Sequence, residues 1–166
     1  MGAPSHQEPD LLNILAAEHE GMNHLFAQLK DKGSDRERLF TKLTNELEMH
    51  SALEERLVYP ILEGVSAATH TKARRAVQDH KAVATLLKEI TKVDFADPEF
   101  DRLLLELEKN VKRHVREEEE ELFPMIRQNT TSEELRRRGV TFMHTKQSLK
   151  LPPLDTTAAR APQTTM

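Results

Sequence analysis

Four histidines and two glutamates stand where the helical spacing of the apolar residues would otherwise place a leucine. These six residues are His19, His50, Glu54, His80, His114 and Glu118. An unpaired carboxylate in a protein core costs far more free energy than a chain of this size can lose. The six groups must therefore satisfy each other or bind something, and together they predict a buried polar site.

The spacing of these residues indicates a metal site. His50 and Glu54, like His114 and Glu118, are separated by three residues. Residues at i and i+4 share one face of a helix, roughly 6 Å apart along its axis, so each pair can reach one point. Four imidazoles and two carboxylates suit a first-row transition metal better than calcium or magnesium. We therefore predict a dinuclear site bridged by Glu54 and Glu118.

An internal repeat supports this prediction. Residues 50–60 align with residues 114–124, because His, Glu-Glu, two apolar or aromatic residues and Pro recur at the same offsets. Glu18-His19 likewise matches Asp79-His80. Each half of the chain is thus expected to form a helical hairpin that carries one single His and one His-x3-Glu.

The elements that must position these residues are helices. Apolar residues step by three and four along stretches at about residues 11–30, 36–63, 67–92 and 98–128. A helix stop and a new N-cap are expected at residues 32–35, and an N-cap followed by a first-turn proline at Asp97-Pro98. Four such stretches with short connections predict an all-α, up-down-up-down four-helix bundle.

The domain organisation follows from these stretches. We expect the bundle to cover residues 10–130 and a short C-terminal helix to cover residues 131–147. Residues 1–9 and the Pro/Thr/Ala-rich residues 148–166 have little to bury and are expected to be disordered.

Composition excludes several classes of function. The 166 residues contain no cysteine, which excludes disulfides, thiolate zinc sites, iron–sulfur clusters and cysteine nucleophiles. A net charge of −4 gives no reason to expect a nucleic acid partner. No apolar run is long enough to span a membrane, and the first ten residues lack the basic and apolar parts of a signal peptide. We expect a cytoplasmic protein.

The doubled His-x3-Glu-Glu followed by an aromatic residue and Pro resembles the hemerythrin and HHE cation-binding domains, over about residues 10–128. That resemblance implies a four-helix bundle with two iron ions joined by carboxylates and an oxo or hydroxo bridge. Its ligands would be His19, His50, Glu54, His80, His114 and Glu118. Glu119 is an alternative to Glu118, because oxygen-carrying members use a carboxylate one residue further along. Manganese accepts the same ligand types as iron.

The resemblance also narrows the function. Oxygen carriers place a second His one turn away on the third helix, where this chain has Ala76 or Ala84. The chain is thus similar to a six-ligand branch that includes iron–sulfur repair proteins and peroxide- or NO-responsive proteins. The leading hypothesis is a di-iron protein that binds O2, H2O2 or NO for sensing or detoxification. Open alternatives are a peroxide-disproportionating or ferroxidase enzyme, iron storage or delivery, and a metal-free bundle.

The remaining candidates have plainer interpretations. His6 and His144 lie near the ends, His70 is expected in a loop, and His24 falls off the apolar stripe beside Phe26. We expect all four histidines at the surface, with His24 the best candidate among them for an entrance or outer group. Tyr59 and Phe123 are expected to pack near the ends of their helices rather than to take part in redox chemistry.

Overall fold

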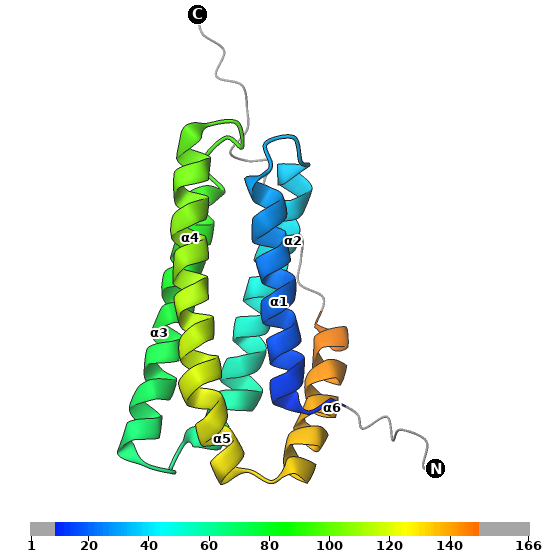
Figure 1. Ribbon diagram of the computed structural model, residues 1–166, viewed down its shortest axis with the longest axis vertical. Coiled ribbons are helices and arrows are strands. Elements are labelled where there is room, and N and C mark those ends of the chain that lie inside the picture. Colours follow the sequence, from blue (N-terminus) through cyan, green and yellow to red (C-terminus); the bar gives the residue numbers. More distant parts are fainter. Residues whose placement is uncertain (1–8, 150–166) are drawn as a thin grey trace, which may run out of the picture.

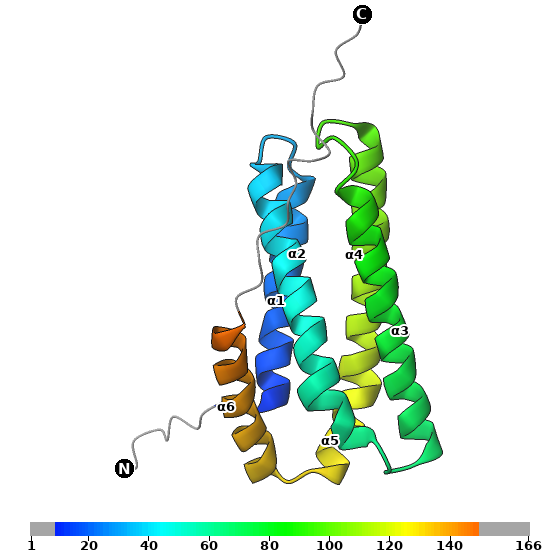
Figure 2. The same ribbon diagram turned by 180° about the vertical axis from the view of Figure 1, so that it is seen from behind.

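The computed structural model describes residues 9–149, and every regular element among them is helical. The α-helices are α1 (Leu11–Lys30), α2 (Arg36–Leu53), α3 (Ala67–Ile90), α4 (Pro98–Glu117), α5 (Phe123–Asn129) and α6 (Ser132–Ser148). Helices α1 to α4 alternate in direction, with α1 and α2 on one side and α3 and α4 on the other (Figure 1). Helix α6 runs along the lower half of α1 and α2 (Figure 2). The predicted four-helix bundle with an added C-terminal helix is confirmed. Residues 1–8 and 150–166, expected to be disordered, lie outside the described residues.

Side-chain caps fix where the bundle helices begin. The carboxylates of Asp10, Asp35 and Asp97 accept hydrogen bonds from first-turn backbone N–H groups of α1, α2 and α4, at 2.9, 3.1 and 2.8 Å. Each bond satisfies a donor that the first turn of a helix leaves without an intrahelical partner. Pro98 opens α4, where its missing N–H costs nothing.

Two π-helical segments interrupt the second and fourth helices, where the sequence predicted continuous α-helix. Segment η1 covers Glu54–Val58, and η3 covers Glu118–Leu122. In each segment a backbone N–H bonds to the carbonyl five residues back instead of four. A proline stands at the second position after each segment. In a regular α-helix its ring would crowd the carbonyl four residues back. After η1 the chain continues as a short 3₁₀ helix, η2 (Tyr59–Leu62).

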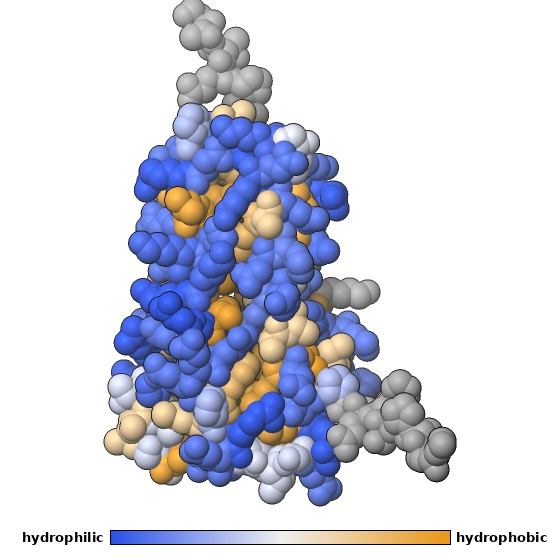
Figure 3. All heavy atoms as spheres, viewed as in Figure 1, coloured by the Kyte–Doolittle hydropathy of each residue, from blue (hydrophilic) through white to orange (hydrophobic). Residues whose placement is uncertain are grey.

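The core is divided into two apolar clusters. The upper cluster lies at the end of the bundle where one loop joins α1 to α2 and another joins α3 to α4, at the top of Figure 1. It includes Phe26, Phe40 and Phe100. The lower cluster lies at the opposite end, where Leu135 and Phe142 of α6 join it. The side of the molecule seen in Figure 3 is mostly hydrophilic, with hydrophobic residues along a strip in its lower half. No helix in the described part of the chain has the length and apolar character needed to cross a membrane.

Packing of α6 against the start of α1 depends on Gly139. A Cβ atom at this position would lie 2.9 Å from the Pro9 carbonyl oxygen and 3.1 Å from the Leu11 backbone nitrogen. Backbone atoms cannot move aside easily, so Gly139→Ala should lower the free energy of unfolding by about 1–3 kcal/mol. Urea denaturation of variant and parent in the same metal state measures this change.

Gly21 in α1 provides the matched control. A Cβ atom there meets nothing within 4 Å. Gly21→Ala should therefore raise the free energy of unfolding by roughly 0.5–1 kcal/mol, through helix propensity alone. Equal effects of the two substitutions would contradict the close packing of α6 on α1.

Candidate metal centre

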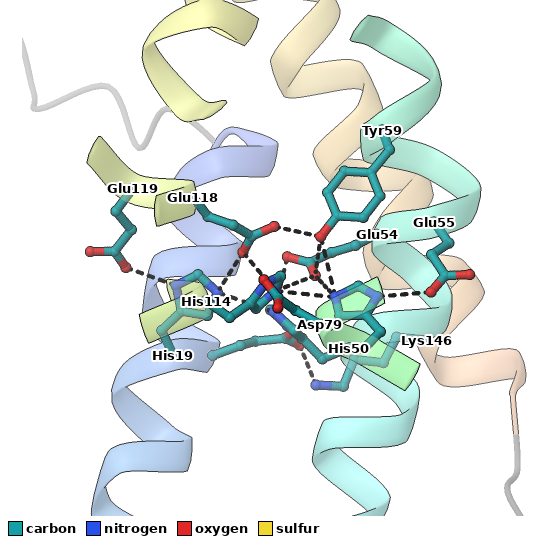
Figure 4. A network of polar contacts seen from close by, with 12 residues as sticks. His19, His50, Glu54, Glu55, Tyr59, Asp79, His114, Glu118, Glu119 and Lys146 are labelled. Carbon is teal, nitrogen blue, oxygen red and sulfur yellow. Dashed lines mark hydrogen bonds and ion pairs between the residues drawn. The ribbon is translucent and has the colours of Figure 1, made fainter. Parts of the chain in front are cut away.

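The six ionisable residues singled out in the sequence meet in one layer between the two apolar clusters, which we call the polar layer. It consists of His19, His50, Glu54, His80, His114 and Glu118. Each helix of the bundle contributes to it, and no member is more than 7% exposed. Figure 4 shows the carboxylates of Glu54 and Glu118 among the imidazole rings. The structure therefore brings together every residue that the sequence assigned to the site.

The histidines form two pairs. In the first pair the Nε2 atoms of His19 and His50 are 3.1 Å apart, and in the second pair those of His80 and His114 are also 3.1 Å apart. The two rings of each pair meet edge to face. Both pairs thus turn the same ring nitrogen toward a common point.

The other nitrogen of each ring, Nδ1, faces a carboxylate outside the polar layer. The Nδ1···O distances are 2.7 Å for His19–Glu119, 2.7 Å for His50–Glu18, 2.8 Å for His80–Glu55 and 3.7 Å for His114–Asp79. A neutral imidazole that donates from Nδ1 has only a lone pair at Nε2. Two lone pairs 3.1 Å apart repel each other unless a proton or a cation lies between them. This arrangement fits a metal ion at each pair.

The two carboxylates connect the pairs. The Glu54 oxygens lie 3.0 Å from Nε2 of His50 and 3.2 Å from Nε2 of His80. One oxygen of Glu118 lies 3.4 Å from Nε2 of His19 and 3.6 Å from Nε2 of His114. Each carboxylate therefore approaches one histidine of each pair, as a bridging ligand must.

Two buried oxygens support the same interpretation. Glu54 Oε1 and Glu118 Oε2 are inaccessible to solvent and make no hydrogen bond of good geometry, although they lie 3.0 Å from Nε2 of His50 and 3.4 Å from Nε2 of His19, and a bound cation would satisfy both oxygens. Glu119 is 42% exposed and contacts the outer nitrogen of His19, so the geometry favours Glu118 over Glu119 as the bridge. The set of metal ligands itself stays a prediction.

Without metal, charge balance in the polar layer is supplied by protons. Burial by itself lowers the pKa of His50, but the carboxylates of Glu54 and Glu18 outweigh it and raise the pKa to about 10. Burial also opposes protonation of His80 and His114, yet Glu54 raises the pKa of both. Burial raises the pKa of Glu54 in turn, but the neighbouring histidines, His50 foremost, hold it well below its ordinary value. Metal ions would take the place of these protons.

Tyr59 adds a polar group to the site that the sequence did not predict. Its ring is buried near the end of its helix, as expected, but its hydroxyl lies inside the polar layer. It donates to Glu118 at 2.6 Å and lies 3.2 Å from Nε2 of His80. Burial and the charges of Glu54 and Glu118 raise the pKa of Tyr59, so the phenol keeps its proton. Phe123, its counterpart in the repeat, stacks on His19 with ring centroids 6.0 Å apart and offers no hydroxyl.

The repeat contained signals for the outer groups. Glu18, Asp79, Glu55 and Glu119 each directly precede or follow a polar-layer residue in the sequence. This recurring acidic neighbour is the feature that could have identified them. Each contacts a histidine on a different helix, a pairing that only the tertiary structure defines.

The remaining histidines lie away from the polar layer. His24 is 79% exposed and pairs with Glu20 at 3.7 Å, so it is a surface residue and not an entrance group. His70 is exposed as expected, but it lies in the first turn of α3 and not in a loop, because Ser66 caps that helix four residues earlier. His144 is exposed on α6. His6 lies outside the described residues.

The fold and the polar layer together define a class: a helical bundle whose buried histidines and carboxylates fit a metal site. The family described as "Hemerythrin HHE cation binding domain" matches residues 10–126, and the chain belongs to this family. The expected family membership is confirmed. The family description states cation binding, in agreement with the polar layer.

Two individual proteins are similar to this chain. A crystal structure of a hemerythrin HHE cation binding domain-containing protein from Mycobacterium kansasii, described as an Rv2633c homolog, has a TM-score of 0.74 and 21% identity. The match covers 84% of this chain and 86% of the Mycobacterium kansasii chain. A protein of Nostoc sp. strain PCC 7120 described as a DNA nickase is 25% identical over 146 residues, or 87% of this chain. The chain spans about two fifths of that curated relative, 41% of its length.

Metal binding should release protons. At pH 8, a His50 side chain with a pKa of about 10 is protonated in metal-free protein, and a metal ion must displace that proton from Nε2. Adding Zn²⁺ or Fe²⁺ should therefore release at least one proton per chain, and metal affinity should rise with pH up to about pH 10. A pH-indicator dye in weakly buffered solution measures the release. His24→Gln should not change it, and metal uptake without proton release would contradict the pKa of His50.

Proposed function

We propose that this protein holds two iron ions in the polar layer and uses them to bind a small oxidant, O2, H2O2 or NO, for sensing or detoxification. One observation carries the proposal: four histidines form two pairs, and each of two carboxylates lies near one histidine of both pairs. When bound, iron supplies a ferrous–ferric couple and open coordination positions for such a molecule.

The side chains of this protein hold and enclose the ions. Two imidazoles would serve each ion, and Glu54 and Glu118 would lie between the two ions. The outer carboxylates fix the ring orientations and make each Nε2 a stronger donor to a metal. The apolar clusters above and below exclude bulk water from the polar layer.

A cavity gives a small molecule access to this layer. It has a volume of about 530 Å³, lies between α3 and the α4–η3 helix, and reaches His114 and Glu118. Lys72 pairs with Glu121 beside it, and Arg75 pairs with Glu117 at 3.1 Å. Ion pairs with solvent-exposed partners are worth about 0–1 kcal/mol, so these contacts can open readily.

Tyr59 supports a catalytic form of the same function. Its hydroxyl holds a proton beside Glu118 and the second histidine pair. Disproportionation of H2O2 requires proton movement at the site where peroxide is bound, and this phenol is placed to assist it. Peroxide turnover is therefore the second candidate function. The activity named for the Nostoc protein is not carried over, because the chain corresponds to 41% of it and has a net charge of −4.

The test is metal analysis with optical spectroscopy. Protein reconstituted anaerobically with Fe²⁺ and then exposed to air should contain two iron ions per chain. It should show the absorption of a bridged ferric pair, and that absorption should change with H2O2 or NO. Oxygen evolution from H2O2 would identify the catalytic form, and preferential retention of manganese would correct the choice of metal.

Variants link these signals to the polar layer. His80→Ala removes a buried member of the second pair and should lose about half of the iron and the spectral response. His24→Ala, at an exposed position, should behave as the parent. A parent protein that takes up no transition metal would contradict the proposal.

Ala76→His should make oxygen binding more stable. Ala76 is buried and lines the cavity beside His114 and Glu118, so an imidazole there could reach the metal centre. Ala84 is exposed and lines a hollow between α2 and α3 that includes His80 but neither His114 nor Glu118, so Ala84→His is the control. Stopped-flow absorption should show slower loss of bound O2 in Ala76→His only. Identical behaviour of the two variants would contradict this account of the open position.

A further inference from the structure

Lys146 lies in the last turn of α6, outside residues 10–126 that match the family, yet it contacts the surroundings of the polar layer. Its ammonium group donates to Oε1 of Glu18 and, at 3.2 Å, to Glu46. The other oxygen of Glu18 accepts from Nδ1 of His50 at 2.7 Å. Lys146 and His50 thus share one carboxylate, and both are labelled in Figure 4.

The contact between Glu18 and Lys146 is partly enclosed. Glu18 is 13% exposed and Lys146 is 29% exposed, so solvent screens their charges only in part. Glu55 and Glu119, which hold histidines in the equivalent way, are each 42% exposed. Within residues 9–149 neither of these two has a lysine or arginine within ion-pair distance.

Asp79, the counterpart of Glu18 in the repeat, is also 13% exposed and accepts from Arg113 at 2.8 Å, but its other oxygen lies 3.7 Å from Nδ1 of His114, too far for a hydrogen bond. Among the four outer carboxylates, Glu18 is therefore the one that joins a cation and a histidine through hydrogen bonds on both sides.

A cation on the outer carboxylate changes how strongly the histidine binds a metal ion through its other ring nitrogen. A carboxylate that accepts from Nδ1–H strengthens the imidazole as a metal ligand, and a stronger donor favours the more highly charged metal ion. An ammonium group on the same carboxylate neutralises part of its charge and weakens that effect. It also adds a positive charge close to the metal, which again favours the lower oxidation state.

We propose that Lys146 is a positioning residue that holds Glu18 against His50 and partly neutralises the charge of the Glu18 carboxylate. Through this contact, α6 shifts the iron centre toward its ferrous form. The inference rests on the proposed di-iron function and concerns the first histidine pair. It gives the C-terminal helix a role beyond packing: a change in the docking of α6 would change the redox balance of the metal centre.

The test is the midpoint potential of the iron-loaded protein, measured by spectroelectrochemistry in four proteins: the parent, Lys146→Met, Lys146→Arg and Glu46→Gln. Lys146→Met should lower the potential and raise the ratio of ferric to ferrous affinity on the order of tenfold. For one electron, tenfold corresponds to about 59 mV. Lys146→Arg keeps the positive charge and should restore the parent potential.

Glu46→Gln is the control for a change of charge beside Lys146 that is not on Glu18, because it removes the charge from the second contact of Lys146 and leaves Glu18 paired. It should leave the potential unchanged. The inference would be overturned if Lys146→Met had the same midpoint potential as the parent protein. It would also be overturned if Glu46→Gln and Lys146→Met shifted the potential equally. If the midpoint potential shifts as expected but the iron centre reacts with no oxidant, the proposed function is overturned and the role of Lys146 stands. If the centre reacts with an oxidant but its potential does not depend on Lys146, the role of Lys146 is overturned and the proposed function stands.

Discussion

The burial of two carboxylates among four imidazoles is the constraint on which the rest of this structure depends. Glu54 and Glu118 are shielded from solvent at the centre of the bundle, where an uncompensated charge costs several kcal/mol. Four histidines, four outer carboxylates and one tyrosine hydroxyl surround them, so that every charge has a partner of opposite sign or a hydrogen-bond donor. Metal ions at the two histidine pairs would complete this balance, since Glu54 Oε1 and Glu118 Oε2 make no hydrogen bond of good geometry.

The bundle holds this network through a repeated helical hairpin. Each half provides a single His from one helix and a His-x3-Glu that ends in a π-helical segment just before a proline. The two halves differ in the groups that lie beside each histidine pair. Tyr59 places a hydroxyl beside the second pair, whereas Phe123 stacks on the first. On the first pair, Lys146 brings a charge from outside the repeated hairpins. The second pair thus has a phenol hydroxyl beside it, and at the first pair one carboxylate is shared between His50 and a lysine.

Features that depend on local spacing could be predicted from the sequence. The apolar stripes, the caps at Asp35 and Asp97 and the six polar-layer residues follow from helical periodicity, and the structure agrees on all of them. Features that depend on how helices rotate against each other could not. Tyr59, which directly follows η1, donates to Glu118 of another helix, and the contact between Glu18 and His50 also joins two helices. Sequence spacing along one helix carries no information about either contact.

The proposed function depends on two metal ions in the polar layer, one at each histidine pair. Anomalous scattering from an iron-loaded crystal, recorded on both sides of the iron absorption edge, tests it most directly. Two peaks are expected, one between the Nε2 atoms of His19 and His50 and one between those of His80 and His114, with Glu54 in contact with both. A single peak, or iron held away from these nitrogens, would contradict it.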